Sequence, residues 1–270
     1  WIDENMFEDA TMRVYSTLGN PNVLGEYLLL VLPMAAAYVC AHKKNEFAKW
    51  VYASVFICLF VCLILTQSRG CWLGFMFEAV IFVTFYNGRL WGLLPLLLLI
   101  LPLAVPQTVV NRLMSIGDMD DSSTSYRVFI WMGTLALLRD FWVGGIGMGE
   151  AAFNSVYPFY SYNAIIAPHS HNLYLQLITE SGIAALIVFV IVMLAYIKNM
   201  MTAYSEQKRD KPRSAAALAF ISGVMGFLLQ SMTDYTFYNY RVMAVFFMYI
   251  AMGMAYKGFM TGGNFNGKDS

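Results

Sequence analysis

The chain has 270 residues, of which 59% are hydrophobic, 16% aromatic and only 13% charged. This composition, with a mean hydropathy of +0.57, excludes an ordinary soluble domain and predicts an all-α polytopic transmembrane helix bundle. The 17 basic and 17 acidic residues balance, which gives no sign of the basic surface that nucleic-acid binding needs, so we expect no nucleic-acid partner.

Seven apolar stretches of the chain are each about long enough to cross a membrane. The first has a well-marked start, because Asn20 can cap the free amides of a helix and Pro21 suits its first position. A polar segment, Trp1 to Leu18, precedes it. The chain begins with Trp1 and not Met, which indicates a fragment of a longer chain whose N-terminal helices are missing. The predicted spans are 22–41, 47–66, 71–86, 90–105, 173–197, 215–230 and 242–256.

The basic residues in the connections predict the orientation of this bundle. Eleven of them fall in one set of connections and six in the other. We expect the larger set, which holds all the close-spaced clusters, in the cytoplasm. It contains Lys43, Lys44, Lys49, Arg89, Lys198, Lys208, Arg209, Lys211, Arg213, Lys257 and Lys268. The long polar interval 107–171 is then an extracytoplasmic loop, and short amphipathic helices are expected within it.

All six basic residues of the outer set are arginines, whereas every lysine falls in the cytoplasmic set. Translocation bias explains why outer basic residues are few, but it gives no reason for all of them to be arginine. A guanidinium group binds phosphate or carboxylate through paired hydrogen bonds, so the pattern hints at an anion site. The outer set is Arg13, Arg69, Arg112, Arg127, Arg139 and Arg241.

Two of these arginines are expected at helix starts. Arg69 immediately precedes the third span, and Arg127 falls in the first turn of an amphipathic helix predicted over Tyr126–Leu138 and capped by Ser125. A cation at a helix N-terminus is unfavourable unless an anion is shared, so both positions suit a diphosphate. For Arg69 the alternative is that it caps the end of the second span or reaches lipid headgroups.

Two of the three histidines, His169 and His171, lie together at the predicted start of the fifth span. An imidazole can accept a proton from a hydroxyl group near neutral pH, and a simple interfacial hydrogen-bonding role is the alternative. We expect no metal site, because no third ligand stands at helical spacing from the pair. The acidic residues Asp118, Asp120 and Asp121 are interpreted as a solvated loop tip, with a divalent-ion site as the alternative.

A polar stripe continues from the histidines along one face of the fifth span. Its last member, Glu180, would either orient a site or satisfy a contact inside the bundle, where a membrane carboxylate normally faces. The stripe consists of Asn172, Gln176, Thr179 and Glu180.

Two other segments of the chain also carry residues that could matter for a site. The glycine cluster 144–150 lacks nucleotide-binding spacing and predicts a turn after the amphipathic helix. Asp234, Asn239 and Arg241 mark the outer ends of the sixth and seventh spans.

Five short motifs occur in order along nearly the whole chain. They are Leu18-Gly19-Asn20-Pro21-Asn22, Thr66-Gln67-Ser68-Arg69-Gly70, Ser125-Tyr126-Arg127 with Trp131, Gly145-Ile146-Gly147-Met148-Gly149, and Pro168-His169-Ser170-His171-Asn172 leading to Glu180-Ser181-Gly182. Together they resemble the O-antigen ligase and polymerase superfamily of bacterial membrane proteins. Members of that superfamily are larger, so the chain resembles their C-terminal, catalytic part.

This resemblance implies a metal-independent glycosyltransferase with a GT-C-like helix bundle, no cofactor and an active site on the outer face of the bacterial cytoplasmic membrane. The implied donor is a glycan on undecaprenyl diphosphate, and the acceptor is another lipid-linked glycan (polymerase) or a lipid A core sugar (ligase). By position, Arg69 and Arg127 would hold the diphosphate, His171 would be the general base and His169 would assist. The further candidate substrate-binding residues are Arg241, Asn172 and Glu180.

A transporter or flippase for an anionic lipid-linked solute is the alternative function, since Glu180 and the outer arginines would also suit it. Such a protein should carry polar groups deep in several spans, and often an internal repeat. In this sequence the polar groups gather at the outer ends of the spans, which favours the transferase.

Overall fold

The computed structural model describes residues 13–44, 46–93, 107–118 and 120–262, and within these ranges it contains helices and no strand. Six of the described helices are long and apolar enough to cross a membrane. For α3, the candidate span also includes the turn that follows it. They are α1 (Pro21–Ala41), α2 (Phe47–Leu65), α3 (Arg69–Asn87), α9 (Ile183–Glu206), α10 (Lys211–Gln230) and α11 (Tyr240–Gly262). The predicted all-α polytopic bundle is confirmed.

Two of the predicted spans do not correspond to a single described helix. The one near 90–105 begins in a 3-10 turn, η3 (Gly88–Leu93), and otherwise lies outside the described residues. The one near 173–197 corresponds to two helices, α8 (Leu173–Ser181) and α9, which meet at Gly182 with φ +76°. Long apolar runs flank this short polar break, so hydropathy averaged over a membrane-length window does not detect it. Glu180 therefore lies before the spanning helix and not within it.

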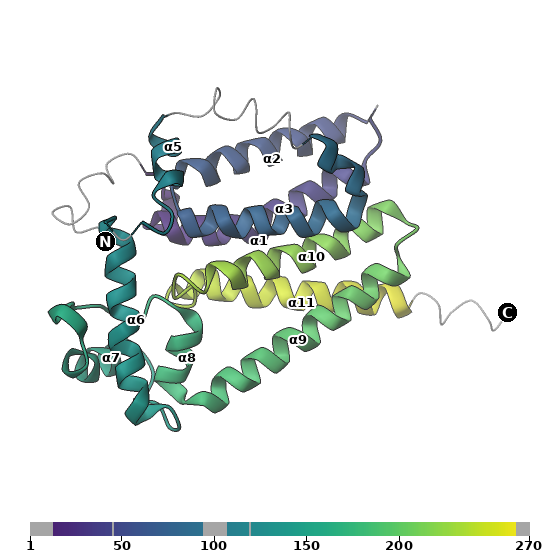
Figure 1. The fold of residues 1–270 in the computed structure, drawn as a ribbon. Helices are drawn as coiled ribbons and strands as arrows, with labels where there is room; N and C mark the ends of the chain where they lie inside the picture. The colour runs from purple at the N-terminus through teal and green to yellow at the C-terminus, as the bar shows by residue number, and fades with distance from the viewer. Residues whose placement is uncertain (1–12, 45, 94–106, 119, 263–270) are drawn as a thin grey trace.

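The bundle is built around α1 and α10, which are the most deeply buried of the membrane-length helices. Helix α10 packs mainly against α1 and α3, and α9 and α11 lie along its other side (Figure 1). Phe227, Phe246 and Tyr249 form part of the main apolar core between α10 and α11. Helices α3 and α10 approach closely at Gly74 and Gly226. A Cβ added at Gly74 would lie only 2.9 Å from the Gly226 carbonyl oxygen, so the contact needs glycine there.

The outer helices expose apolar side chains instead of polar ones. Ile57 on α2, Val188 on α9 and Met248 on α11 are each more than half exposed, as expected for helices that face lipid. All four cysteines are free; Cys71 is buried between α1 and α3, whereas Cys58 is exposed on the outer face of α2.

The segment predicted as a large loop forms a layer of short helices at one end of the bundle. It contains α5 (Gln107–Met114), α6 (Ser122–Phe141), α7 (Glu150–Val156) and the 3-10 turns η4 (Tyr157–Phe159) and η5 (Tyr162–Ala164). Helix α8 follows this segment and packs against α6. Helix α6 runs across the end of the bundle (Figure 1). The layer has its own small apolar core, in which Ile130, Leu137, Phe153 and Tyr157 are nearly inaccessible to solvent.

The glycine-rich turn after α6 docks onto the end of α8. The Ile146 amide donates to the Thr179 carbonyl at 2.7 Å, and the Ile183 amide donates to the Trp142 carbonyl at 2.8 Å. Gly182 has a left-handed backbone, and a Cβ there would overlap the Val143 carbonyl oxygen. The turn expected after the amphipathic helix thus fixes the angle between the end layer and α9.

Replacing Gly182 by alanine should therefore lower the stability of the purified protein by about 1 to 3 kcal/mol, because the new Cβ meets both backbone strain and a steric overlap. Thermal unfolding in detergent measures this loss. The matched control is Gly88→Ala, since Gly88 has a φ of −57° and open space around its Cα. Equal unfolding temperatures for the two variants would show that the turn does not need glycine at 182.

Candidate active site

The start of α1 brings two polar side chains to the end layer. Asn20 caps the helix as predicted, accepting the Asn22 amide at 2.8 Å. Asn22 in turn accepts from the Arg13 Nη2 at 2.8 Å and donates its own Nδ2 to Asp234 at 3.1 Å. Arg13 also donates through Nε to the Thr66 carbonyl at 2.8 Å. The first motif therefore places Asn22 beside the connection between α10 and α11, where Asn22 also binds Arg13.

Four arginines gather at this end of the bundle. Burial and the repulsion of the neighbouring cations, Arg112 first and then Arg127 and Arg69, lower the pKa of Arg13 to about 10. Among the residues that the structure describes, Asp121 forms ion pairs with Arg69 and Arg112, and Asp234 forms one with Arg127. Four guanidinium groups that repel one another raise the local positive potential, which suits an anionic ligand.

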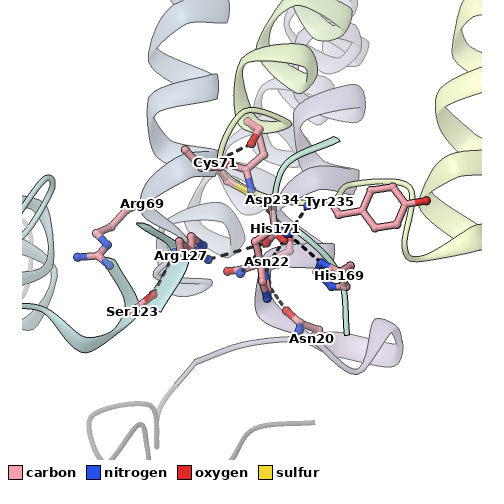
Figure 2. A network of polar contacts seen from close by, with 12 residues as sticks. Asn20, Asn22, Arg69, Cys71, Ser123, Arg127, His169, His171, Asp234 and Tyr235 are labelled. Carbon is pink, nitrogen blue, oxygen red and sulfur yellow. Dashed lines mark hydrogen bonds and ion pairs between the residues drawn. The ribbon is translucent and has the colours of Figure 1, made fainter. Parts of the chain in front are cut away.

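Asp234 is the common partner of the candidate residues (Figure 2). Its Oδ1 accepts from the Tyr235 amide at 2.9 Å and lies 3.1 Å from His171 Nδ1, and its Oδ2 lies 3.9 Å from Arg127 Nη2. Burial raises the pKa of this carboxyl, but the His171 hydrogen bond and the charges of His171 and Arg127 outweigh it and hold the pKa well below the usual range. Asp234 is therefore ionised at neutral pH.

An ionised Asp234 can only accept a hydrogen bond, and this determines the tautomer of His171. The Nδ1 atom must carry the proton that it shares with Oδ1, so in the neutral form of the ring the lone pair is on Nε2, which can accept a proton. His171 is held in a left-handed backbone conformation, with φ +48°, and its carbonyl accepts from Trp131 Nε1 at 3.2 Å. Its side chain keeps 20% of its surface exposed, so the free nitrogen can be reached.

His169 has a different environment from His171. It is buried, and its Nδ1 accepts the His171 backbone amide at 3.2 Å. Burial, with the nearby His171, lowers the pKa of His169 to about 3, so the ring is neutral. Its proton then lies on Nε2, and His169 can donate a hydrogen bond but cannot act as a base at neutral pH.

Arg127 lies in the second turn of α6 and not in the first, because the helix begins at Ser122 and not at Tyr126, as a Ser125 cap would predict. Asp121 is the N-cap, and its side chain accepts the Thr124 amide. Arg127 Nη1 donates to Ser123 Oγ at 3.0 Å. Its Nε is buried and has no hydrogen-bond partner in the part of the chain that the structure describes. A partly buried guanidinium with a spare donor is well placed for an anion.

Arg69 stands at the first position of α3 and is only 9% exposed. Its Nη1 donates to both the carbonyl and the hydroxyl of Ser115 at 2.8 Å, and its Nη2 donates to Asp121 Oδ1 at 2.7 Å. Arg69 thus reaches across to the segment between α5 and α6. The interpretation of Asp121 as part of a solvated loop tip is wrong, because this carboxylate joins Arg69, Arg112 and the start of α6.

The remaining predicted residues lie around this cluster in different ways. Asn172 caps α8 and donates to the Met232 carbonyl at 2.7 Å. Glu180 is buried and accepts from Gln176, from the Gly149 amide and from Tyr235. Arg241 is exposed, and the hydrogen bonds of its side chain within the described residues go to the Thr17 carbonyl and the Tyr240 hydroxyl. Arg127 and His171 thus share the Asp234 carboxylate, and His169 is bonded to the His171 amide, whereas Arg241 is not part of this network in the described part of the chain.

Sequence reasoning missed Arg13, Asn22 and Asp234 as members of the site. Asn22 belongs to the first motif and Asp234 marks a span end. Neither signal shows that the two side chains meet, since 212 residues separate them.

His169, His171 and Asp234 could also hold a metal ion, because one ligand atom from each lies within 4.8 Å of the others. The third ligand that the sequence lacks at helical spacing thus comes from a distant connection. In the observed arrangement, however, two of the nitrogens already form hydrogen bonds. His171 Nδ1 is bonded to Asp234, and His169 Nδ1 accepts the His171 backbone amide.

These features define a multi-pass membrane protein with a histidine-aspartate pair and an arginine cluster at one end of its bundle. The sequence model of the O-antigen ligase family matches residues 54–190, which is half of the chain, and the chain belongs to that family. Membership implies a glycan-processing protein of the ligase or polymerase type whose substrates are lipid-linked. No curated protein matches the chain.

The Asp121 carboxylate should stabilise the end layer at neutral pH. Burial raises its pKa, but the hydrogen bond and charge of Arg69 outweigh this and lower it. The stabilisation is therefore present above the unfolded pKa and is lost as the pH falls through the folded one. We expect Asp121→Asn to cost on the order of 1 to 3 kcal/mol at pH 7 and progressively less as the pH falls below the unfolded pKa of the carboxyl. Unfolding in detergent across this pH range measures the difference.

The control is Asp120→Asn, the same substitution at an exposed neighbour. A cost for Asp121→Asn that stays constant down to pH 3 would contradict the assignment of the ion pair.

Proposed function

We propose that the protein is a metal-independent glycosyltransferase that moves a glycan from undecaprenyl diphosphate to a lipid-linked glycan acceptor on the outer face of the bacterial cytoplasmic membrane. The observation that carries this proposal is the pairing of a base with a cation cluster. His171 has a free Nε2 fixed by Asp234, and Arg127 lies 3.9 Å from the same carboxylate. A base beside an anion site is the combination that glycosyl transfer from a diphosphate needs.

The diphosphate would bind to the arginine cluster. Arg127 offers its unpaired Nε, and Arg13, Arg69 and Arg112 add positive charge around it. Arg69 is bound to Ser115 and Asp121, so its role is to hold the segment before α6 and to contribute positive charge. It could contact the diphosphate directly only if these bonds were broken. The cluster would balance the negative charge that develops on the leaving diphosphate.

In the transfer step, the acceptor hydroxyl oxygen forms a bond to the anomeric carbon of the donor sugar. The bond from that carbon to the diphosphate oxygen breaks, and the electron pair leaves with undecaprenyl diphosphate. The hydroxyl proton moves to His171 Nε2, which forms an imidazolium hydrogen-bonded to Asp234. Asp234 holds the ring in the right tautomer and stabilises its charge.

The charges of this site also support chemistry without a metal ion. A divalent cation on the two histidines and Asp234 would have to break the His171–Asp234 hydrogen bond, and it would lie close to the Arg127 guanidinium. The arginines can supply the charge stabilisation that a metal provides in other transferases.

The distribution of lysine supports an outward-facing site. Lys43 follows the end of α1, Lys208 follows the end of α9, and Lys257 lies in the last two turns of α11, whereas Asp234 lies between the end of α10 and the start of α11. These lysines are therefore at the opposite end of the bundle from Asp234. Lysine-rich ends of membrane helices face the cytoplasm. The arginine end, with α6 across it, is then extracytoplasmic.

One observation favours a transporter as the second candidate. Glu78 is buried in the middle of α3, and among the described residues neither of its carboxylate oxygens has a hydrogen-bond partner. Intramembrane acids of this kind often serve ion or proton pathways. Movement of a lipid-linked glycan across vesicles, abolished in Glu78→Gln and independent of any acceptor, would favour the transporter over the transferase.

The transferase proposal is tested with the full-length protein in lipid and a glycan on undecaprenyl diphosphate. Free undecaprenyl diphosphate should appear together with a longer or transferred glycan, and EDTA should leave the rate unchanged. His171→Ala and Arg127→Ala should each reduce the rate about thirty-fold to a thousand-fold, since each removes about 2 to 4 kcal/mol of transition-state stabilisation.

The matched control for these two variants is Lys208→Ala, an exposed basic residue at the other end of the bundle. Full activity in His171→Ala, with normal membrane insertion, would remove the general-base assignment.

Asp234→Asn separates a role in catalysis from a role in folding. The amide cannot fix the His171 tautomer or stabilise an imidazolium, so kcat should fall about a hundred-fold or more. Removal of a negative charge beside Arg127 should at the same time leave the affinity for undecaprenyl diphosphate unchanged or increase it. If both turnover and affinity fall together, Asp234 acts only by holding the site together.

A further inference from the structure

A cavity lies on the far side of His169 from the arginine cluster. It has a volume of about 210 Å³ and opens to solvent, which is small compared with the roughly 300 to 1,000 Å³ of sites for drug-sized ligands. Its walls come from the start of α7, the loop before α8, α8 itself and the connection between α10 and α11. The lining residues are Gly149, Glu150, Pro168, His169, Gln176, Glu180, Tyr235, Phe237 and Tyr238.

The polar groups of this cavity are held in fixed positions. Glu180 is 8% exposed, and its Oε1 accepts from Gln176 Nε2 at 3.0 Å and from the Gly149 amide at 3.1 Å. Across the mouth, the Tyr238 hydroxyl donates to Glu150 Oε2 at 3.3 Å. Such carboxylate, amide and phenol groups can exchange hydrogen bonds with several hydroxyls of one small ligand.

The cavity also has aromatic walls around His169. The His169 ring lies 5.4 Å from the ring of Tyr235 and 4.6 Å from that of Tyr238, measured between centroids. Phe237 adds a third aromatic side chain. Flat apolar surfaces beside hydrogen-bonding groups suit a ligand with both C–H faces and hydroxyls, which is the chemistry of a sugar ring.

The charge of this cavity differs from that of the arginine cluster. Its lining contains two glutamates and no lysine or arginine, so it would repel a diphosphate. His169 separates the two regions: its ring faces Tyr238 on one side and lies 4.2 Å from the His171 ring on the other. A ligand in the cavity is therefore one ring's width from the proposed base.

From this arrangement we infer that the cavity is a subsite for the terminal sugar of the acceptor glycan, neutral or basic in charge, which it holds through Glu150, Glu180 and Tyr238. This inference rests on the proposed function. The acceptor hydroxyl would lie toward His171, while the diphosphate of the donor lies at Arg127 on the other side. His169, neutral with its proton on Nε2, can donate to an oxygen of the bound sugar, which gives it a positioning role in place of a second base.

Binding measurements without turnover test this subsite. The probe is a lipid-free oligosaccharide, released by mild acid from the lipid-linked glycan that the host cell makes, and its affinity for the full-length protein is measured by ligand-detected NMR. Undecaprenyl diphosphate without glycan is the second probe. Glu150→Gln and Tyr238→Phe alter exposed side chains, so both variants should fold.

Each variant should weaken binding of the oligosaccharide about tenfold and change the affinity for undecaprenyl diphosphate less than twofold. Arg127→Ala should do the reverse. The matched control is Tyr160→Phe, which removes a hydroxyl bonded to Asp140 outside the cavity. Unchanged oligosaccharide binding in both cavity variants would overturn the subsite, as would an equal loss for both probes.

The same measurements separate failure of the subsite from failure of the proposed function. Oligosaccharide binding that depends on Tyr238, in a protein that never transfers a glycan, would support the cavity and refute the transferase. Transfer with normal dependence on His171, but without any effect of Tyr238 or Glu150 on acceptor binding, would keep the transferase and refute the cavity.

Discussion

The Asp234 carboxylate is the interaction on which the candidate site depends. It lies in the connection between α10 and α11, and it accepts hydrogen bonds from Asn22 at the start of α1 and from its neighbour Tyr235. It also fixes the tautomer of His171 and lies beside Arg127 on α6. Four segments that are distant in sequence therefore meet at one buried negative charge, and each must be in place for that charge to be compensated.

Asp121 has a similar structural role at the neighbouring helix junction. It joins Arg69 at the start of α3 to the start of α6, and it is itself the N-cap of α6. Arg127 lies in the second turn of that same helix. The ion pair between Arg69 and Asp121 therefore helps to set the position of Arg127 in the site. The bundle and the end layer are thus held together by ion pairs at helix ends. The Asp121 carboxylate interacts favourably with the α6 dipole, and it compensates the charge of Arg69 at the start of α3.

The local features of the fold could be predicted from the sequence, and the contacts between distant segments could not. Asn20 and Pro21 mark a helix start closely, and the apolar runs identify membrane helices directly. The start of α6 is ambiguous in the sequence because Asp121 and the residues up to Ser125 all have side chains that can cap a helix. The break at Gly182 escapes prediction because apolar residues flank it on the α9 side, and a single glycine gives only a weak signal.

The candidate site shows the same division. His171 and Arg127 stand out by residue type and by motif, whereas the contact of His171 with Asp234 spans 63 residues and has no local signature. The sequence offers the histidines no third metal ligand nearby, and the fold supplies one in Asp234. The positive charge of the surrounding arginines argues against a metal ion. That these arginines lie beside Asp234 is seen only in the folded structure.

The arrangement of charges also explains how a buried site could perform the proposed transfer. As the glycosidic oxygen leaves, the diphosphate gains one negative charge, and His171 gains one positive charge with the acceptor proton. Both changes occur beside Asp234 and the arginines, so the net charge of the site stays constant through the transition state. In a partly dehydrated site, where an uncompensated charge is costly, this balance lowers the barrier without a mobile metal ion. A glutamate-lined cavity on the other side of neutral His169 would then keep diphosphate and acceptor sugar in separate places.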